Sequence, residues 1–178
     1  MVDTSGSPKK ITPGDIRAVF VRSNLFQGSW NFERMQALGF CFSMVPVIRR
    51  LYPENNDDRK QAIKRHLEFF NTQPFVAAPV LGVTIAMEEQ RANGAPIDDG
   101  AINGIKVGLM GPLAGVGDPI FWGTVRPVFA ALGAGIAMSE NGSSMRRGLG
   151  IMFGLSIAFA ASTFFLDFFG FAGGVEFA

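Results

Sequence analysis

A short helix with one apolar side is predicted near the start of the chain, from Ile16 to Phe26. Its apolar residues recur three or four positions apart, beside Arg17 and Arg22, which is typical of a basic amphipathic helix. Asp15 follows a Pro-Gly pair and is expected to cap this helix. Such a helix can lie in a membrane interface or on the surface of a soluble protein, and the apolar segments that follow favour the interface.

Two apolar runs come next, and both are short. The run Met35–Ile48 has 14 uncharged residues and the run Phe75–Met87 has 13, whereas a membrane-spanning helix needs about 20. They are expected to be core helices or partial insertions. A charged amphipathic helix is expected between them, over Arg59–Phe70, with Pro74 in the first turn of the next helix. The polar residues Glu88–Gly100 are expected to form a loop.

The segment Gly100–Met138 combines small and helix-breaking residues. Glycines recur every four positions in its first part, and Pro112, Pro119 and Pro127 follow. Small faces allow helices in membranes to approach closely. Short apolar segments that are interrupted by Gly and Pro also mark binding sites in transporters. The pattern therefore predicts broken or re-entrant helices here, with Asp118 in their middle.

The remainder of the chain completes an all-α, integral membrane pattern. A polar loop is followed by Gly148–Leu166, a charge-free run of 19 residues that is long enough to span a bilayer. We expect three parts: a mobile polar tail over 1–10, a membrane domain over 11–138, and an atypical C-terminal transmembrane segment over 139–178.

Composition supports a membrane protein. Of the 178 residues, 48% are hydrophobic and 17% are charged, against about 25% charged in soluble domains. This excludes intrinsic disorder. The net charge of +1 argues against nucleic acid as a ligand. Cys41 is the single cysteine, which excludes a disulfide framework and a Cys-rich zinc site. No apolar signal-peptide core opens the chain.

Charge is distributed unevenly, and this predicts an orientation. The first 66 residues hold eleven Lys/Arg and six Asp/Glu, a net charge of +5, while the rest hold five and nine, a net charge of −4. Positive charge stays on the cytoplasmic side of a membrane. The N-terminus is therefore expected in the cytoplasm.

Three polar residues are candidates for ligand binding. Asp118 places a carboxylate in an apolar segment, where it needs a partner. It could accept hydrogen bonds from sugar hydroxyls or cap a broken helix. Asn71 and Gln73 present neutral amides, which both donate and accept hydrogen bonds. They suit an uncharged polyhydroxylated ligand, and they could equally cap the helix that follows.

Other polar residues point to no self-contained catalysis. Trp30 could stack on a sugar or anchor at the interface, and Glu33 could face a partner or remain solvated. His66 is the single histidine and is expected to be an exposed helix residue. There is no phosphate-binding loop of the G-x-x-x-x-G-K-S/T type, and no metal or cofactor site is predicted.

Three long runs resemble a known family, the IID subunits of mannose-type phosphotransferase-system (PTS) sugar permeases. The runs are Arg22–Phe40 (RSNLFQGSWNFERMQALGF), His66–Phe75 (HLEFFNTQPF) and Gly100–Pro127 (GAINGIKVGLMGPLAGVGDPIFWGTVRP). The resemblance covers about residues 11–138. The chain is shorter than usual for the family, and the tail 139–178 does not resemble the usual continuation.

The resemblance implies a transport subunit of the bacterial inner membrane and not an enzyme. Such subunits form hetero-oligomers with an IIC subunit, contact membrane lipid, and move hexoses of the mannose, glucose and glucosamine class inwards. Cytoplasmic IIA and IIB subunits carry the phosphate, so His66 is not a phosphohistidine. Asn71, Gln73 and Asp118 are then expected to bind the hexose, and Trp30 and Glu33 to contact IIC or support the sugar site.

Two alternatives remain at the level of the sequence. The chain could be a non-transporting interaction protein, which binds IIC or acts as a receptor component for bacteriocins or phage, a role found in this family. A soluble helical enzyme is the weaker alternative, because the apolar run from Gly148 argues against it.

Overall fold

A computed structural model describes residues 8–54, 56–138 and 147–150. Within these residues the chain is helical, and its extended pairing is limited to two isolated bridges, Asn31 with Met35 and Met35 with Phe70. This confirms the predicted all-α class. The helices are α1 (Pro13–Ser23), α2 (Ala37–Leu51), α3 (Asp57–His66), η1 (Pro74–Val76), α4 (Ala78–Ala92), α5 (Asp99–Ile120), η2 (Phe121–Val125) and α6 (Arg126–Ala137).

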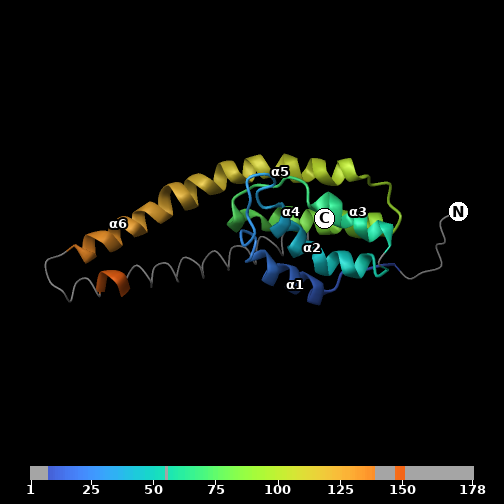
Figure 1. Cartoon of the computed structure of the whole chain (residues 1–178), viewed down its shortest axis with the longest axis horizontal. Helices are drawn as coiled ribbons and strands as arrows, with labels where there is room; N and C mark the ends of the chain where they lie inside the picture. The colour runs from blue at the N-terminus through green and yellow to red at the C-terminus, as the bar shows by residue number, and fades with distance from the viewer. Residues whose placement is uncertain (1–7, 55, 139–146, 151–178) are drawn as a thin grey trace.

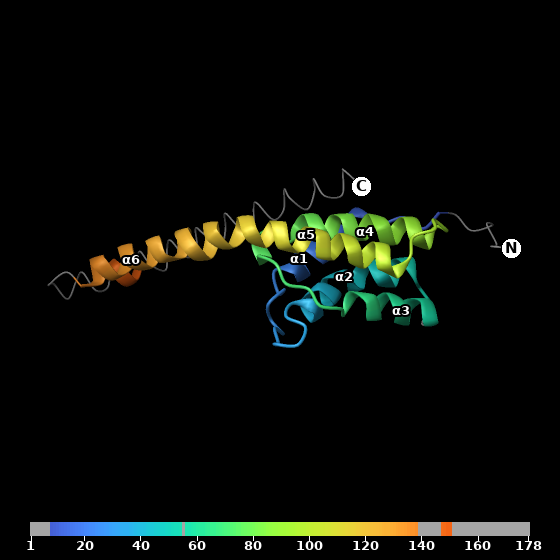
Figure 2. The same ribbon diagram turned by 90° about the horizontal axis from the view of Figure 1, so that it is seen from above.

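The described helices form two regions (Figures 1 and 2). Helices α1 to α4 pack together, and we call them the bundle. Helix α5, the π-helical turn η2 and helix α6 follow one another as one long rod. The first part of α5 lies against the bundle, whereas α6 projects well beyond it.

Phenylalanines from three parts of the chain fill the centre of the bundle. Phe26, Phe40 and Phe70 are almost completely buried. The ring centroids of Phe40 and Phe70 lie 4.7 Å apart, and those of Phe26 and Phe40 lie 6.0 Å apart. Gly39 makes this packing possible, because a Cβ atom there would overlap the backbone of Phe26. The apolar run predicted from Met35 is therefore a core helix.

Helix α1 begins earlier than the sequence suggested. Thr12, not Asp15, is its N-cap, and Asp15 closes a capping box three residues later. The Thr12 Oγ1 atom accepts a hydrogen bond from the Asp15 N–H at 3.3 Å, and the Asp15 carboxylate accepts one from the Thr12 N–H at 3.0 Å. The prediction of Asp15 as the cap was wrong by one turn. Asp15 is also paired with Arg50 of α2 at 2.5 Å.

The expected loop over Glu88–Gly100 is half helix. Helix α4 continues to Ala92, and Glu88, which was expected in the loop, lies inside this helix and is completely buried. The predicted turn at Asn93–Gly94 is confirmed, since Gly94 has a φ of 95°. Asp98 then caps α5 by accepting a hydrogen bond from the Ala101 N–H.

The Gly/Pro segment was predicted to form broken or re-entrant helices, and its described residues instead form a continuous helical path. Helix α5 passes through Pro112 and Pro119 and leads into η2 without leaving the helical path. The helix adjusts by a π-helical turn just after Pro119. There the Thr124 hydroxyl donates to the Pro119 carbonyl at 2.9 Å, which satisfies a backbone group that the wider turn leaves available.

None of the helices in the described part of the chain combines the length and apolar character needed to cross a bilayer. The predicted span Gly148–Leu166 lies outside the described residues from 151 onward.

Candidate functional site

The segment that carries Asn71 and Gln73 lies along α5. The Asn71 N–H donates to the Met110 sulfur at 2.9 Å, and the Thr72 hydroxyl donates to the Met110 carbonyl at 3.0 Å. Gln73 is the N-cap of η1, and Pro74 is in its first turn, as predicted. Thr72 is also fixed to α2, because Gln36 exchanges two hydrogen bonds with its backbone. The two predicted amides therefore sit on a segment held from both sides.

Gln73 is completely buried, yet half of its amide has no partner. Its Oε1 atom accepts a hydrogen bond from the Phe75 N–H at 3.4 Å. Its Nε2 atom is buried and has no hydrogen-bond partner in the structure. A buried polar group without a partner costs free energy, about 1–3 kcal/mol. The Gln73 amide therefore caps η1 through its oxygen, while its N–H donors lie buried without a partner among the described residues.

Asp118 lies on α5 and is exposed. Its neighbour Gly117 is buried against Gln73, and a Cβ atom at Gly117 would overlap the Gln73 side chain. Asp118 follows within the continuous helix, so it does not cap a broken one. Asn71 is exposed and lies near Met110, about two turns away along α5. The structure thus brings Gln73 to the Asp118 segment and leaves Asn71 at its edge.

An aromatic group lies next to Gln73, and the sequence analysis missed it. Phe75 of η1 packs on Phe121 and Trp122 of η2, with ring centroids 5.2 Å and 6.3 Å apart. The Arg126 guanidinium lies 5.2 Å from the centre of the Trp122 ring. The feature of the sequence that could have indicated this group is the Phe-Trp pair that directly follows Asp118-Pro119-Ile120.

Trp30 and Glu33 lie in another part of the molecule, the loop before α2. The rings of Trp30 and Phe32 pack edge to face with centroids 4.9 Å apart, and both are exposed. Glu33 is paired with Arg34 at 3.5 Å, with 81% of its side chain exposed. These residues form a surface feature of the bundle and present an aromatic and an acidic group to the outside.

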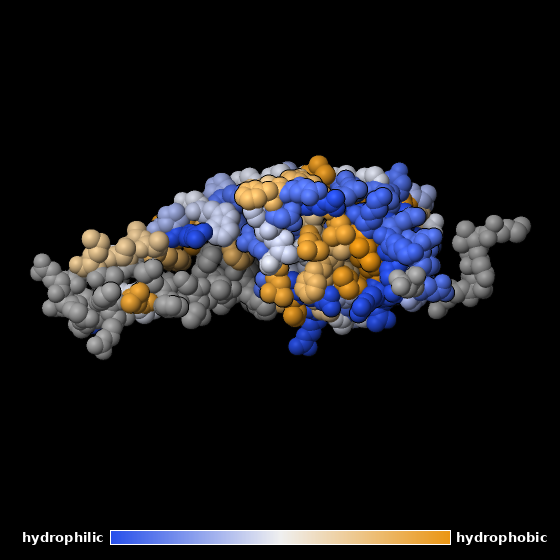
Figure 3. Space-filling view, viewed as in Figure 1, coloured by the Kyte–Doolittle hydropathy of each residue, from blue (hydrophilic) through white to orange (hydrophobic). Residues whose placement is uncertain are grey.

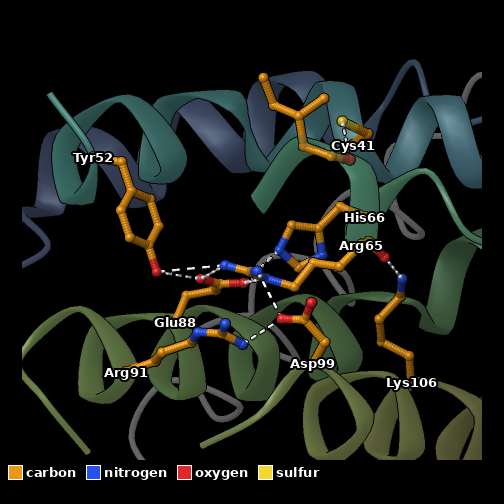
Figure 4. Close-up of polar contacts among 9 residues, drawn as sticks. Cys41, Tyr52, Arg65, His66, Glu88, Arg91, Asp99 and Lys106 are labelled. Carbon is orange, nitrogen blue, oxygen red and sulfur yellow. Dashed lines mark hydrogen bonds and ion pairs between the residues drawn. The ribbon is translucent and has the colours of Figure 1, made fainter. Parts of the chain in front are cut away.

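The most prominent polar cluster was also missed, and it lies inside the bundle (Figure 4). Glu88 of α4 is at its centre. It accepts hydrogen bonds from Arg65 at 2.6 Å and 3.1 Å, from the Tyr52 hydroxyl at 2.9 Å, and shares a 2.9 Å hydrogen bond with His66. Asp99, at the start of α5, pairs with Arg65 at 2.9 Å. One carboxylate thus connects α2, α3 and α4, and a second extends the network to α5.

Burial and partners shift the pKa values of this cluster in opposite ways. Burial alone would raise the pKa of Glu88, but the hydrogen bonds from His66 and Arg65 outweigh it and lower the pKa to about 2. Burial lowers the pKa of His66 below its ordinary value of 6.5, despite the nearby carboxylate. His66 is therefore neutral, with its Nε2–H donating to Glu88. The expectation of an exposed His66 was wrong, because the end of α3 packs against the core.

Lys106 completes the inner polar contacts from α5. It is fully buried, and its ammonium donates to the Arg65 carbonyl at 3.2 Å, near the end of α3. It also lies 4.7 Å from the centre of the Phe40 ring. Burial lowers the pKa of Lys106 to about 8. The cluster is thus a set of polar connections between helices. The described residues contain no group of three His, Cys, Asp or Glu arranged to hold a metal ion.

The sequence model of one family matches nearly the whole chain. The family is the PTS system mannose/fructose/sorbose family IID component, and the match covers residues 10–178. It extends beyond the resemblance over 11–138 and includes the tail.

Curated relatives agree with this family. The chain is 85% identical over 143 residues to the mannose-specific PTS EIID component of Escherichia coli K12, covering 79% of this chain and 50% of that protein. It is 67% identical over 133 residues to the sorbose-specific EIID component of Klebsiella pneumoniae, covering 75% and 48%. The chain therefore spans about half the length of the curated relatives it matches.

A solved structure has the same fold. The cryo-EM structure of the mannose transporter ManYZ in complex with microcin E492 aligns with a TM-score of 0.80 at 73% sequence identity, over 94% of this chain and 60% of that chain. Together, the family match and these identities show that the chain belongs to the mannose/fructose/sorbose family of PTS IID components.

Proposed function

We propose that this chain is the IID subunit of a mannose-type permease, which pairs with an IIC subunit to move hexoses inwards across the bacterial inner membrane. The observation that carries this proposal is the match of the family model over residues 10–178. The likeness to the ManYZ transporter structure, with a TM-score of 0.80, supports a two-subunit assembly.

In this proposal the hexose binds where η1 crosses α5. Gln73 supplies an amide donor that has no partner among the described residues; because Gln73 is completely buried, a sugar reaches this donor only when the contact between η1 and α5 opens. Asp118 supplies an exposed carboxylate one residue from the contact between Gly117 and Gln73. Asn71 borders the same crossing through its contact with Met110. Amides and a carboxylate bind sugar hydroxyls without requiring ligand charge. This chemistry suits mannose, glucose and glucosamine alike.

The bundle would lie at the cytoplasmic surface of the membrane, with the N-terminus in the cytoplasm. Its basic residues and exposed apolar side chains favour contact with lipid headgroups. On α1 and α2, Val21 is 59% exposed and Leu38 is 48% exposed, and Arg22 lies 4.7 Å from the centre of the Phe42 ring. Figure 3 shows apolar surface gathered on this part of the molecule, with hydrophilic residues around it. Trp30 and Glu33 are then available for contact with IIC.

Phosphate would be transferred by the IIA and IIB partners and not by this chain. His66 is fully buried, and one of its ring nitrogens is engaged with Glu88. A phosphoryl donor would have to open the bundle to reach it. This supports a transport role in which the chain binds and positions the sugar.

The test is uptake in bacterial cells that lack their own IID subunit. This chain would be co-expressed with matching IIC and IIAB partners, and phosphoenolpyruvate-dependent uptake of labelled 2-deoxyglucose would be followed. Uptake that requires the chain is the expected result. No uptake, with the chain in the membrane and bound to IIC, would contradict the transport proposal.

A second candidate function is a receptor or interaction role without transport. The neighbouring ManYZ structure contains microcin E492, which favours this candidate for at least one relative. It predicts that cells expressing the chain with IIC become sensitive to the microcin while taking up no sugar. Sugar uptake without microcin sensitivity would support the transporter alone.

A further inference from the structure

The aromatic residues beside Gln73 form a group that the predicted hydrogen-bonding residues do not include. Phe75, Phe121 and Trp122 meet where η1 contacts the π-helical turn η2. Phe121 is 8% exposed, whereas Trp122 is 38% exposed. The group thus has a buried base and a tryptophan that reaches the surface.

The contact between η1 and the rod fixes this group relative to the Gln73 amide. Gly117 lies against Gln73, and a Cβ atom at Gly117 would also come within 3.0 Å of Val76. The Gln73 Oε1 atom accepts the Phe75 N–H. The amide donor and the rings are therefore parts of one arrangement, held at the same crossing.

The π-helical turn determines where the tryptophan is placed. A π turn inserts one extra residue into a helix and rotates the residues that follow it, and such turns occur frequently at functional sites. Here the turn starts at Phe121, directly after Asp118-Pro119-Ile120. Arg126 then lies over the Trp122 ring at 5.2 Å and restricts its orientation. The turn and the arginine together hold an indole ring in place beside the crossing.

We propose that Trp122, supported by Phe75, forms an aromatic wall on which the apolar C–H face of the hexose ring stacks, while Gln73 binds a hydroxyl. A pyranose has one polar rim and one apolar face, so a site with an unpartnered amide N–H and an aromatic ring suits both. The inference rests on the proposed function, because it assigns further contacts to the same sugar site. It adds Trp122 and Phe75 as residues that determine affinity.

The test uses the chain in complex with its IIC partner in detergent, with every tryptophan replaced by 5-fluorotryptophan. The chain has two tryptophans, Trp30 and Trp122, and W30F and W122F variants assign their ¹⁹F signals. Addition of 2-deoxyglucose is expected to shift the Trp122 signal and leave the Trp30 signal unchanged. Trp30 is thus an internal control, because it lies in the loop before α2.

Equilibrium dialysis with labelled 2-deoxyglucose on the same samples separates the possible outcomes. W122A is expected to weaken binding about tenfold, and W122F much less, because an aromatic face remains. Sugar binding with an unchanged Trp122 signal, or equal affinity of W122A and wild type, would overturn the aromatic wall and leave the proposed function intact. No sugar binding by the wild-type complex would overturn both.

Discussion

The bundle and the rod differ in how their apolar and charged side chains are packed. Inside the bundle, Glu88 is fully buried, and it has the partners Arg65 on α3 and Tyr52 at the end of α2. Along the rod, apolar side chains are open to the surroundings, including Val116 at 62% exposed and Leu132 at 52%. The core of the bundle is packed within the described residues, whereas these rod residues stay exposed there, and in the proposed function the IIC subunit or lipid covers them.

Glycines show the same contrast. A Cβ atom at Gly39 in the bundle would overlap the Phe26 backbone, whereas a Cβ atom at Gly104, Gly108, Gly111 or Gly115 in the rod would meet nothing within 4 Å. In the bundle, glycine is required by packing that already exists. At these four positions of the rod the described residues supply no neighbour, and only farther along α5 does Gly117 lie against Gln73. The bundle glycine is thus fixed by packing that the described residues supply, whereas the four rod glycines form a small-residue face suited to a partner helix.

The largest effect is expected from Glu88→Gln. The change removes the charge that pairs with buried Arg65, and breaking a buried ion pair from one side costs about 3–5 kcal/mol. The free energy of unfolding would be measured in detergent by denaturant titration. Glu89→Gln is the matched control, because Glu89 is partly exposed. Equal stability of the two variants would show that the network does not stabilise the bundle.

Acid is expected to act on the same interaction. Because the folded pKa of Glu88 is about 2 against 4.5 when unfolded, its stabilisation is present above pH 4.5 and is lost as the pH falls towards 2. The loss is on the order of 3 kcal/mol. His66 makes the stability fall already at higher pH, because the unfolded chain binds a proton at His66 below about pH 6.5, whereas the buried, folded His66 does not. Glu88→Gln should remove the steeper part of the pH dependence, and an unchanged profile would contradict this assignment.

Alanine at glycine positions should separate the two regions directly. Gly39→Ala is expected to destabilise the chain by about 1–3 kcal/mol, because the new methyl group meets the Phe26 backbone. Gly108→Ala should stabilise the isolated chain by about 0.5–1 kcal/mol, because helix propensity improves and nothing is displaced. Thermal unfolding of both variants provides the measurement. If Gly108→Ala destabilised the isolated chain, another part of the chain would have to pack against Gly108, which would contradict this prediction.

The smallest effect on stability is expected from Glu33→Gln. The Glu33–Arg34 pair is exposed and contributes about 0.5 kcal/mol or less. If Glu33 contacts IIC, as proposed, this variant should reduce co-purification with IIC while its unfolding curve matches that of the wild type. Unchanged co-purification would remove Glu33 from the proposed interface.

The sequence predicted local features better than long-range ones. The helix start at Pro74, the turn at Asn93–Gly94 and the all-α class follow from residues close together in the chain. Glu88 was assigned to a loop because charge usually marks a surface, and its partners Tyr52 and Arg65 lie 36 and 23 positions away. His66 was misplaced for the same reason. Such burial depends on tertiary contacts that no single window of sequence contains.

The candidate site shows the same limit. Gln73 could be proposed from its amide chemistry, but its unpartnered Nε2 atom appears only after η1 is packed on Gly117. Phe75 and Trp122 are 47 positions apart, and the π-helical turn that places Trp122 has no simple sequence signature. The functional class was predicted from the family resemblance of three long sequence runs, because the properties of single residues and short segments did not indicate it.

The most direct test of the account is uptake of labelled 2-deoxyglucose by cells that contain this chain, IIC and IIAB, compared with cells that carry Gln73→Leu or Asp118→Asn. Asp57→Asn is the control, because 87% of the Asp57 side chain is exposed. The account predicts uptake by the wild type and the control, and about tenfold weaker apparent affinity in both site variants while the complex with IIC remains intact. Equal uptake and affinity in all four strains would contradict a sugar site at the crossing of η1 and α5.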